Sequence, residues 1–142
     1  MYYFAYGSNL WRKQMASRCP ENILIGNGRL ERWRWIITTR GYASIVSSES
    51  DHVLGTVYEL TKADEHNLDR FEGVAKNAYR KEIFQVDMNG AKLNCLVYID
   101  QVVKEGYPRD EYIIRINAGI QDASLPEEYV LRYIRPFVPL KN

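Results

Sequence analysis

The strongest constraint on the fold is a hairpin signal in the second half of the chain. Asn89-Gly90 separates residues 79–88 from residues 92–99, two runs rich in apolar, β-branched and aromatic side chains. An Asn-Gly pair suits a two-residue hairpin turn, because both residues tolerate the positive φ angles that the turn requires. The sequence therefore predicts two long antiparallel strands that lie side by side.

Further strands are expected in the first half of the chain. An aromatic run at residues 2–6 predicts a short strand, and residues 23–39 predict one long strand or two joined at Gly26-Asn27-Gly28. Within the latter, Trp33 and Trp35 share one face and the neighbouring arginines share the other, at the period of two that a strand requires. The remaining strands are predicted at residues 43–47 and 53–60.

Four helices are expected between and after these strands. The clearest begins after the N-cap Thr61, carries Asp64 in its first turn and ends near Glu72, with Gly73 in the position of a C-terminal cap. Ser124-Leu125-Pro126-Glu127 resembles a capping box, which predicts a last helix that stops before the next proline. The other two helices are predicted at residues 10–18 and 110–121.

This order of elements is typical of the α+β class, because some strands pair in a hairpin while others are separated by helices. A chain of 142 residues, 46% of them apolar, is large enough to bury one core. We therefore expect a single domain over residues 1–142, with a strongly curved mixed β-sheet that can form a small barrel-like core and helices packed outside.

The charge balance argues against several classes of function. Lysine and arginine total 19 and aspartate and glutamate total 18, so the net charge of +1 gives no attraction to nucleic acid or to an anionic membrane. No apolar run could span a bilayer and no signal peptide is evident, so we expect a cytoplasmic protein. Cys19 and Cys95 are isolated, which favours two reduced thiols, and no Cys/His spacing suggests a metal site.

Two other groups of residues are better explained as ordinary structure. His52 and His66 are the only histidines and no Gly-x-Ser-x-Gly motif accompanies them, so solvated side chains are expected rather than a catalytic triad. The basic and aromatic residues 29–35 resemble a surface that stacks single-stranded nucleic acid. Glu31 interrupts that charge, and the period of two accounts for the stretch as a half-buried strand.

Two segments carry candidate functional groups. In Tyr6-Gly7-Ser8-Asn9-Leu10 a strand leads into a helix through a tight turn, which leaves backbone N–H groups available for a carboxylate or a phosphate. An ordinary capped turn is the alternative, and the spacing alone favours it. Glu72 falls at the negative end of the helix dipole beside aromatic residues, which would raise its pKa toward the range that a general base and acid needs. A surface glutamate with an ordinary pKa is the alternative.

Four motifs, in order and at matching spacing, resemble those of the gamma-glutamylcyclotransferase family over residues 3–133. They are Phe4-Ala5-Tyr6-Gly7-Ser8-Asn9-Leu10; Gly55-Thr56-Val57-Tyr58-Glu59-Leu60 followed by Leu68-Asp69-Arg70-Phe71-Glu72-Gly73-Val74; Tyr79-Arg80; and Tyr112 with Ile116, Gly119, Leu125-Pro126 and Tyr129. The resemblance implies the gamma-glutamylcyclotransferase-like (AIG2-like) fold, an α+β domain with a barrel-like core.

The resemblance also implies an enzyme and a site. Such enzymes cyclise the γ-glutamyl group of a γ-glutamyl-amino acid or γ-glutamyl-amine to 5-oxoproline and release the free amine, an acyltransferase- or lyase-type reaction of glutathione metabolism. Glu72 is then the catalytic general base and acid. The residues implied to bind the substrate are Tyr6, Gly7, Ser8, Asn9, Leu10, Tyr79 and Tyr112. No cofactor or metal is expected, and the expected partner is the small-molecule substrate, with neither nucleic acid nor membrane involved.

Three points stay open at this stage. They are the identity of the leaving amine, the choice between monomer and homodimer, and whether the N-terminal turn binds the substrate carboxylate or the oxyanion of the reaction. A non-catalytic module that binds a small carboxylate metabolite on the same fold is the alternative function. Glu72 argues against that alternative, because an anion binder gains nothing from a carboxylate in its pocket.

Overall fold

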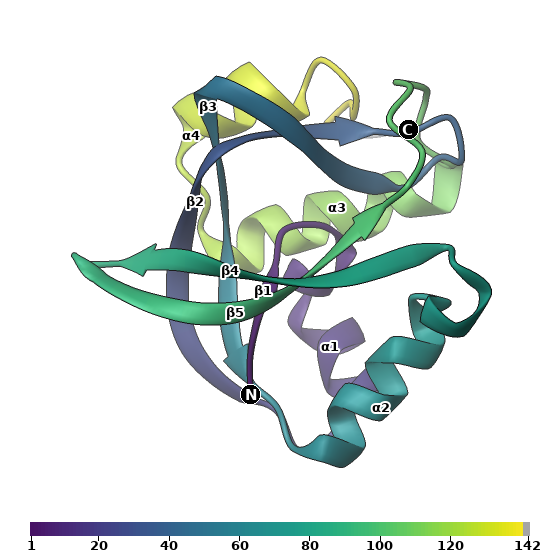
Figure 1. The fold of residues 1–142 in the computed structure, drawn as a ribbon. Coiled ribbons are helices and arrows are strands. Elements are labelled where there is room, and N and C mark those ends of the chain that lie inside the picture. The colour runs from purple at the N-terminus through teal and green to yellow at the C-terminus, as the bar shows by residue number, and fades with distance from the viewer. Residues whose placement is uncertain (141–142) are drawn as a thin grey trace.

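The computed structural model describes residues 1–140, and its strands form a closed barrel (Figure 1). Adjacent strands are antiparallel, except for the first and last of the barrel, which pair in parallel and close it. In order around the barrel, the strands are β1 (Tyr2–Ala5), β3 (Ala43–Glu59), β2 (Ile23–Ile37), β4 (Tyr79–Met88) and β5 (Ala91–Asp100). The expected α+β fold with a curved mixed sheet is confirmed.

The predicted hairpin is present with its two-residue turn. β4 and β5 pair from Tyr79 with Asp100 to Met88 with Ala91, so only two residues lie outside the ladder. Asn89 and Gly90 both have positive φ, 52° and 89°, as the turn type demands. The local sequence signal was therefore sufficient to fix the register of this pair.

The two longest strands differ from the prediction. β2 is a single strand through residues 26–28, and β3 is a single strand where residues 43–47 and 53–60 were predicted as two, so that prediction was wrong. Residues 48–51, between those two runs, stay within the strand but have no partner on β2, and the ladder resumes with His52 opposite Glu31. A bulge follows at Arg32, whose φ is 69°, and it interrupts the simple alternation of side chains that the sequence suggested.

The second helix was predicted closely. α2 (Lys62–Phe71) begins with Asp64 N–H donating to Thr61 Oγ1 at 3.1 Å, and Gly73 follows its end with a left-handed φ of 64°. α1 (Arg12–Arg18) starts later than predicted because residues 8–10 form a separate 3₁₀ turn, η1 (Ser8–Leu10). A second such turn, η2 (Val74–Lys76), follows α2.

The C-terminal helices correct one further prediction. α3 (Asp110–Ala123) ends at Ser124, whose φ of 50° is left-handed, so Ser124 terminates one helix instead of capping the next. α4 (Glu127–Tyr129) has no side-chain cap and continues as the π-helix η3 (Val130–Ile134). The proposed capping box is therefore wrong. None of the helices within residues 1–140 is long and apolar enough to cross a membrane.

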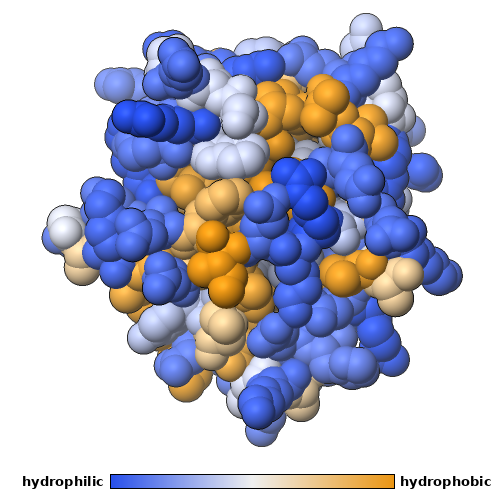
Figure 2. All heavy atoms as spheres, viewed as in Figure 1, coloured by the Kyte–Doolittle hydropathy of each residue, from blue (hydrophilic) through white to orange (hydrophobic). Residues whose placement is uncertain are grey.

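The apolar core has two parts because the barrel wall has two faces. Phe4 of β1 packs with Trp35 and Val57 in a cluster that α3 and η3 also join. Tyr3 on the opposite face of β1 packs with Met15 of α1 and Leu68 of α2. Figure 1 shows α1 and α2 side by side, next to the N-terminal strand. The surface in the same view is largely polar, with apolar side chains concentrated near its centre (Figure 2).

Candidate active site

A cavity of about 340 Å³ lies where β1, the end of α2 and the start of β4 meet. Its walls come from segments that are far apart in the sequence and are brought together by the barrel. They include residues 6–9, 42–43, 71–73 and 78–79, together with Arg40 and with Tyr112 of α3. Both candidate segments of the sequence analysis therefore face one space.

Most of the residues expected in the site line this cavity: Tyr6, Gly7, Ser8, Asn9, Glu72, Tyr79 and Tyr112. Leu10 does not. Its side chain is only 1% exposed and belongs to the core, where it packs against Gly119 so closely that a Cβ on Gly119 would lie 2.7 Å from the Leu10 Cβ. The 3₁₀ turn rotates Leu10 inward, so the expected substrate-binding role does not match its position.

The end of α2 fixes the position of Glu72. Its backbone N–H donates to Leu68 O at 2.9 Å, which keeps Glu72 in the last helical turn. Gly73 then reverses the chain with its left-handed φ, and a Cβ there would come within 3.0 Å of the Ala78 Cβ. The carboxylate is thereby held at the cavity wall, although the neighbouring Phe71 is 55% exposed.

Burial raises the pKa of Glu72 to about 7, against the opposing charges of Arg18 and Arg40. Asp100, a nearby carboxylate, raises it further. Within residues 1–140 no hydrogen bond or ion pair to the Glu72 carboxylate offsets the desolvation. A carboxyl group with this pKa exists in both protonation states near neutral pH, so it can take up a proton and return it.

The tyrosines of the cavity are held by hydrogen bonds of their hydroxyl groups. Tyr6 OH donates to Tyr98 O at 2.5 Å and Tyr79 OH donates to Ala43 O at 3.0 Å. Tyr112 OH accepts from Ala43 N–H at 3.3 Å. Burial raises the pKa of Tyr6, Tyr79 and Tyr112, so these phenols stay neutral and serve as fixed walls.

The N-terminal turn uses its side chains for its own structure. Gln14 Nε2 donates to Ser8 Oγ at 2.7 Å and to Asn9 Oδ1 at 2.8 Å, and Asn9 Nδ2 donates to Tyr3 OH at 3.0 Å. Space at Gly7 is tight, because a Cβ there would lie 3.0 Å from Tyr112 OH and 3.2 Å from the Ala43 Cβ. What the turn offers to a ligand is therefore mainly its backbone.

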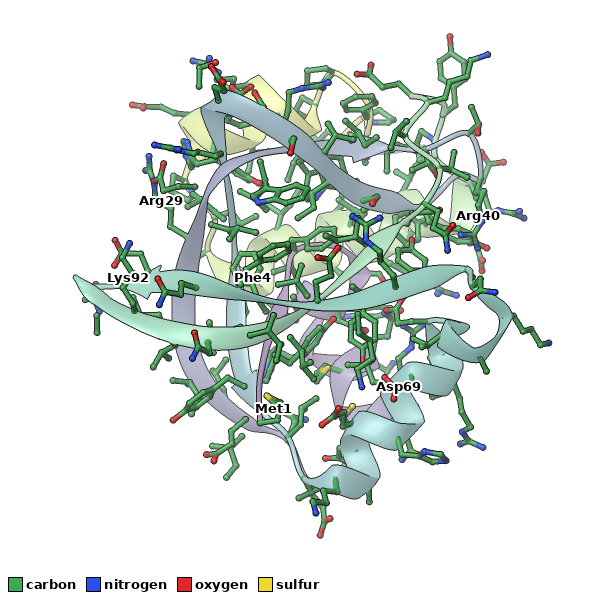
Figure 3. All side chains as sticks on the ribbon, viewed as in Figure 1. Met1, Phe4, Arg29, Arg40, Asp69 and Lys92 are labelled. Atoms are coloured by element: carbon green, nitrogen blue, oxygen red, sulfur yellow. The ribbon has the colours of Figure 1, made fainter. Side chains whose placement is uncertain are left out.

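Several charged residues of the site were missed by the sequence analysis. Arg40 Nη1 pairs with Asp100 Oδ2 at 2.8 Å, although the two residues are 60 positions apart. Asp69 of α2 accepts from Tyr98 OH at 2.6 Å and from Lys81 Nζ at 3.1 Å, which ties the helix to β4 and β5. Figure 3 labels Arg40 and Asp69, which lie on opposite sides of the β4 ribbon in this view. No short-range pattern connects these partners, so only the fold could reveal them.

No group of three or more His, Cys, Asp or Glu side chains within residues 1–140 is arranged to hold a metal ion. Cys19 and Cys95 are both buried free thiols, and burial raises the pKa of Cys19 to about 12, which makes its thiolate inaccessible near neutral pH. The carboxyl group of Glu72, with its pKa of about 7, is suited to acid/base chemistry in this cavity.

Comparison with known proteins gives a consistent result. The family model described as gamma-glutamyl cyclotransferase, AIG2-like, matches residues 3–115. Mouse gamma-glutamylcyclotransferase is 30% identical over 143 residues, which cover 89% of this chain and 73% of the mouse protein. The human gamma-glutamylcyclotransferase is 28% identical over 138 residues, with the same coverage of each chain. A solved structure of a gamma-glutamyl cyclotransferase matches with a TM-score of 0.84 at 27% identity, covering 91% of this chain and 83% of that one.

Proposed function

Because the chain belongs to the gamma-glutamyl cyclotransferase, AIG2-like family, we propose that it converts a γ-glutamyl-amide to 5-oxoproline and a free amine. The observation that carries this proposal is the position of Glu72. Its carboxyl group has a pKa of about 7 and lines the same cavity as the turn of residues 7–9. The names of the mouse and human relatives agree with this chemistry.

The proposed reaction needs one proton carrier. The α-ammonium group of the γ-glutamyl moiety cannot attack until it loses a proton, and the Glu72 carboxylate takes that proton. The free amine then attacks the γ-carbonyl carbon and closes the five-membered ring. Glu72 returns the proton to the amide nitrogen, whose bond to carbon breaks to release the amine. The ring nitrogen still carries two hydrogens after the attack, and it gives up one of them through Glu72 to the released amine, which leaves as its ammonium form. The overall reaction rearranges bonds within one molecule and consumes no water, and general acid/base catalysis of this kind contributes about 10²- to 10⁴-fold.

The surrounding residues would hold the substrate in the folded shape that ring closure requires. Such positioning can supply as much of the rate as the proton transfers. We assign Tyr6, Tyr79 and Tyr112 to the walls that enclose the γ-glutamyl group, because their hydroxyl groups are fixed by the bonds described above. Backbone N–H groups of the turn at residues 7–9 are suited to a developing negative charge.

The test is direct. Purified protein is incubated with a panel of γ-glutamyl-amino acids and γ-glutamyl-amines, and 5-oxoproline is detected by mass spectrometry. We expect turnover by the wild type and loss of turnover by Glu72→Gln, which keeps the shape of the side chain but cannot accept the proton. Wild-type turnover by a folded Glu72→Gln would refute the role of Glu72. Binding without turnover across the panel would favour a non-catalytic binding module instead.

A further inference from the structure

One arginine of the cavity has an unused hydrogen-bonding edge. Arg40 Nη1 donates to Asp100 Oδ2 at 2.8 Å and to Ala78 O at 3.3 Å. Because both bonds of the guanidinium within residues 1–140 come from this nitrogen, Nη2 and Nε stay available. Two neighbouring N–H groups of a guanidinium form the planar fork that binds a carboxylate through two parallel hydrogen bonds.

The fork is held in place by a buried anchor. The side chain of Asp100 is 1% exposed, and its second oxygen, Oδ1, accepts from Val102 N–H at 2.9 Å. The side chain of Arg40 is 36% exposed and lines the cavity. The Arg40 guanidinium therefore faces the cavity, and its carboxylate partner Asp100 is buried. The Arg40 guanidinium carbon also lies 5.9 Å and 5.5 Å from the ring centres of Tyr42 and Tyr79. These contacts fix the guanidinium before any ligand arrives.

The other two arginines of the cavity lack such an anchor. The guanidinium of Arg18 lies over the ring of Phe71, with its carbon 4.8 Å from the ring centre. Arg115 pairs with Glu111, one turn earlier on the solvent-facing part of α3, at 3.1 Å. Only Arg40 combines a buried carboxylate partner with a free edge and a place in the cavity wall.

The chemistry of the substrate defines where its carboxylate must lie. In a γ-glutamyl group the α-carboxylate and the α-amine are attached to the same carbon. A group that binds the carboxylate therefore has to lie beside the base that receives the proton of the amine. Arg40 meets this condition, because both side chains line the same cavity and the positive charge of Arg40 lowers the pKa of Glu72.

Building on the proposed function, we infer that Arg40 binds the α-carboxylate of the γ-glutamyl group through Nη2 and Nε, and that Asp100 is the positioning residue that holds it. The oxyanion on the γ-carbonyl is then assigned to the backbone N–H groups of Gly7 and Asn9, because that of Ser8 already bonds to the Tyr112 hydroxyl. This assigns the two negative groups of the reaction to two different parts of the site.

The kinetic test uses one γ-glutamyl-amino acid and one γ-glutamyl-amine, measured above pH 8 so that Glu72 is ionised in every variant. We expect Arg40→Gln to raise KM about 10- to 100-fold for both substrates, the range for loss of a hydrogen bond to a charged group. Asp100→Asn should raise KM in the same direction with little change in kcat. The double variant should be no worse than Arg40→Gln alone, because Asp100 acts through Arg40.

Arg34 provides a matched control. Its side chain is also 36% exposed and forms an ion pair, with Glu105 at 3.0 Å, but it does not line the cavity. Arg34→Gln should leave KM unchanged. If Arg40→Gln alone unfolds because Asp100 is left as an unpaired buried charge, the double variant removes that charge and carries the test.

A binding measurement separates this inference from the proposed function. By calorimetry, wild-type protein should bind 5-oxoproline, which keeps the former α-carboxylate, more tightly than its neutral carboxamide, and Arg40→Gln should abolish that preference. If the wild type shows the preference but no turnover, the proposed reaction fails while the assignment of Arg40 stands. Absence of the preference in the wild type would overturn the assignment. So would a KM increase confined to the γ-glutamyl-amino acid, which would place Arg40 at the leaving group.

Discussion

Two carboxylates of this protein have similar neighbours but opposite properties. Asp51 on β3 accepts hydrogen bonds from Ser48 Oγ at 2.5 Å and from Tyr133 OH at 2.7 Å, and these bonds lower its pKa. Glu72 is also near tyrosine and arginine side chains, yet burial without a hydrogen bond raises its pKa to about 7. A hydrogen-bonded carboxylate therefore stabilises the fold, whereas a buried carboxylate without such bonds is available for chemistry.

The largest difference between the two carboxylates should appear in catalysis. Glu72→Gln should lower kcat about 10²- to 10⁴-fold, because the general base and acid is lost. Asp51→Asn should leave kcat at the wild-type value, since Asp51 does not line the cavity. Rates of 5-oxoproline release by the two variants measure this directly. An equal loss of kcat in the two variants would mean that the different hydrogen bonding of Asp51 and Glu72 has no bearing on catalysis.

The pH dependence of the wild type should report the same carboxyl group. The reaction needs Glu72 ionised, so kcat/KM should be constant above its pKa of about 7 and fall about tenfold per pH unit below it. A pH profile of the free enzyme between pH 5 and 8 tests this. A midpoint near the ordinary value of 4.5 would contradict the effect of burial.

Stability should change in opposite directions in the two variants. The pKa of Glu72 is raised from 4.5 in the unfolded chain, so its ionisation destabilises the folded state increasingly as the pH rises from 4.5 to about 7. Glu72→Gln should therefore be more stable than wild type by about 3 kcal/mol at pH 8, and the gain should vanish below pH 4.5. Denaturant unfolding at both pH values measures it.

For Asp51 the pH dependence of stability has the opposite sign. Its pKa is lowered, so its stabilising contribution is present above the unfolded pKa and is lost as the pH falls through the folded value. Asp51→Asn weakens the bonds from Ser48 and Tyr133 and should cost about 1 kcal/mol at pH 7. If Asp51→Asn were more stable than wild type at that pH, these two hydrogen bonds would not explain why Asp51 and Glu72 affect stability in opposite ways.

The smallest effect concerns the cation beside Glu72. The charge of Arg18 opposes the effect of desolvation on the pKa of Glu72 more strongly than the charge of Arg40 does. Arg18→Gln should therefore move the midpoint of the pH profile to higher pH, while the plateau value of kcat/KM changes little by comparison with Glu72→Gln. A midpoint shifted to lower pH would show that another group controls the titration.

Much of the fold was predictable because its signals are local. Asn89-Gly90 fixed a hairpin, and Thr61 with Gly73 set both ends of α2. The predictions failed where a distant partner decides the structure. The two runs 43–47 and 53–59 lie in one strand because both pair with β2, on either side of a bulge, and Ser124 ends α3 although its sequence suggests a cap for the next helix.

The candidate site also has features that local sequence predicts and features that depend on distant partners. Local signals in the chain place Glu72 at the end of a helix and residues 7–9 in a turn after a strand, because caps and glycines act within a few residues. The folded barrel is needed to bring these segments to one cavity, to turn Leu10 away from it and to pair Arg40 with Asp100 across 60 residues. The physical reason is that burial and charge pairing depend on distances between elements, which the closure of the barrel sets.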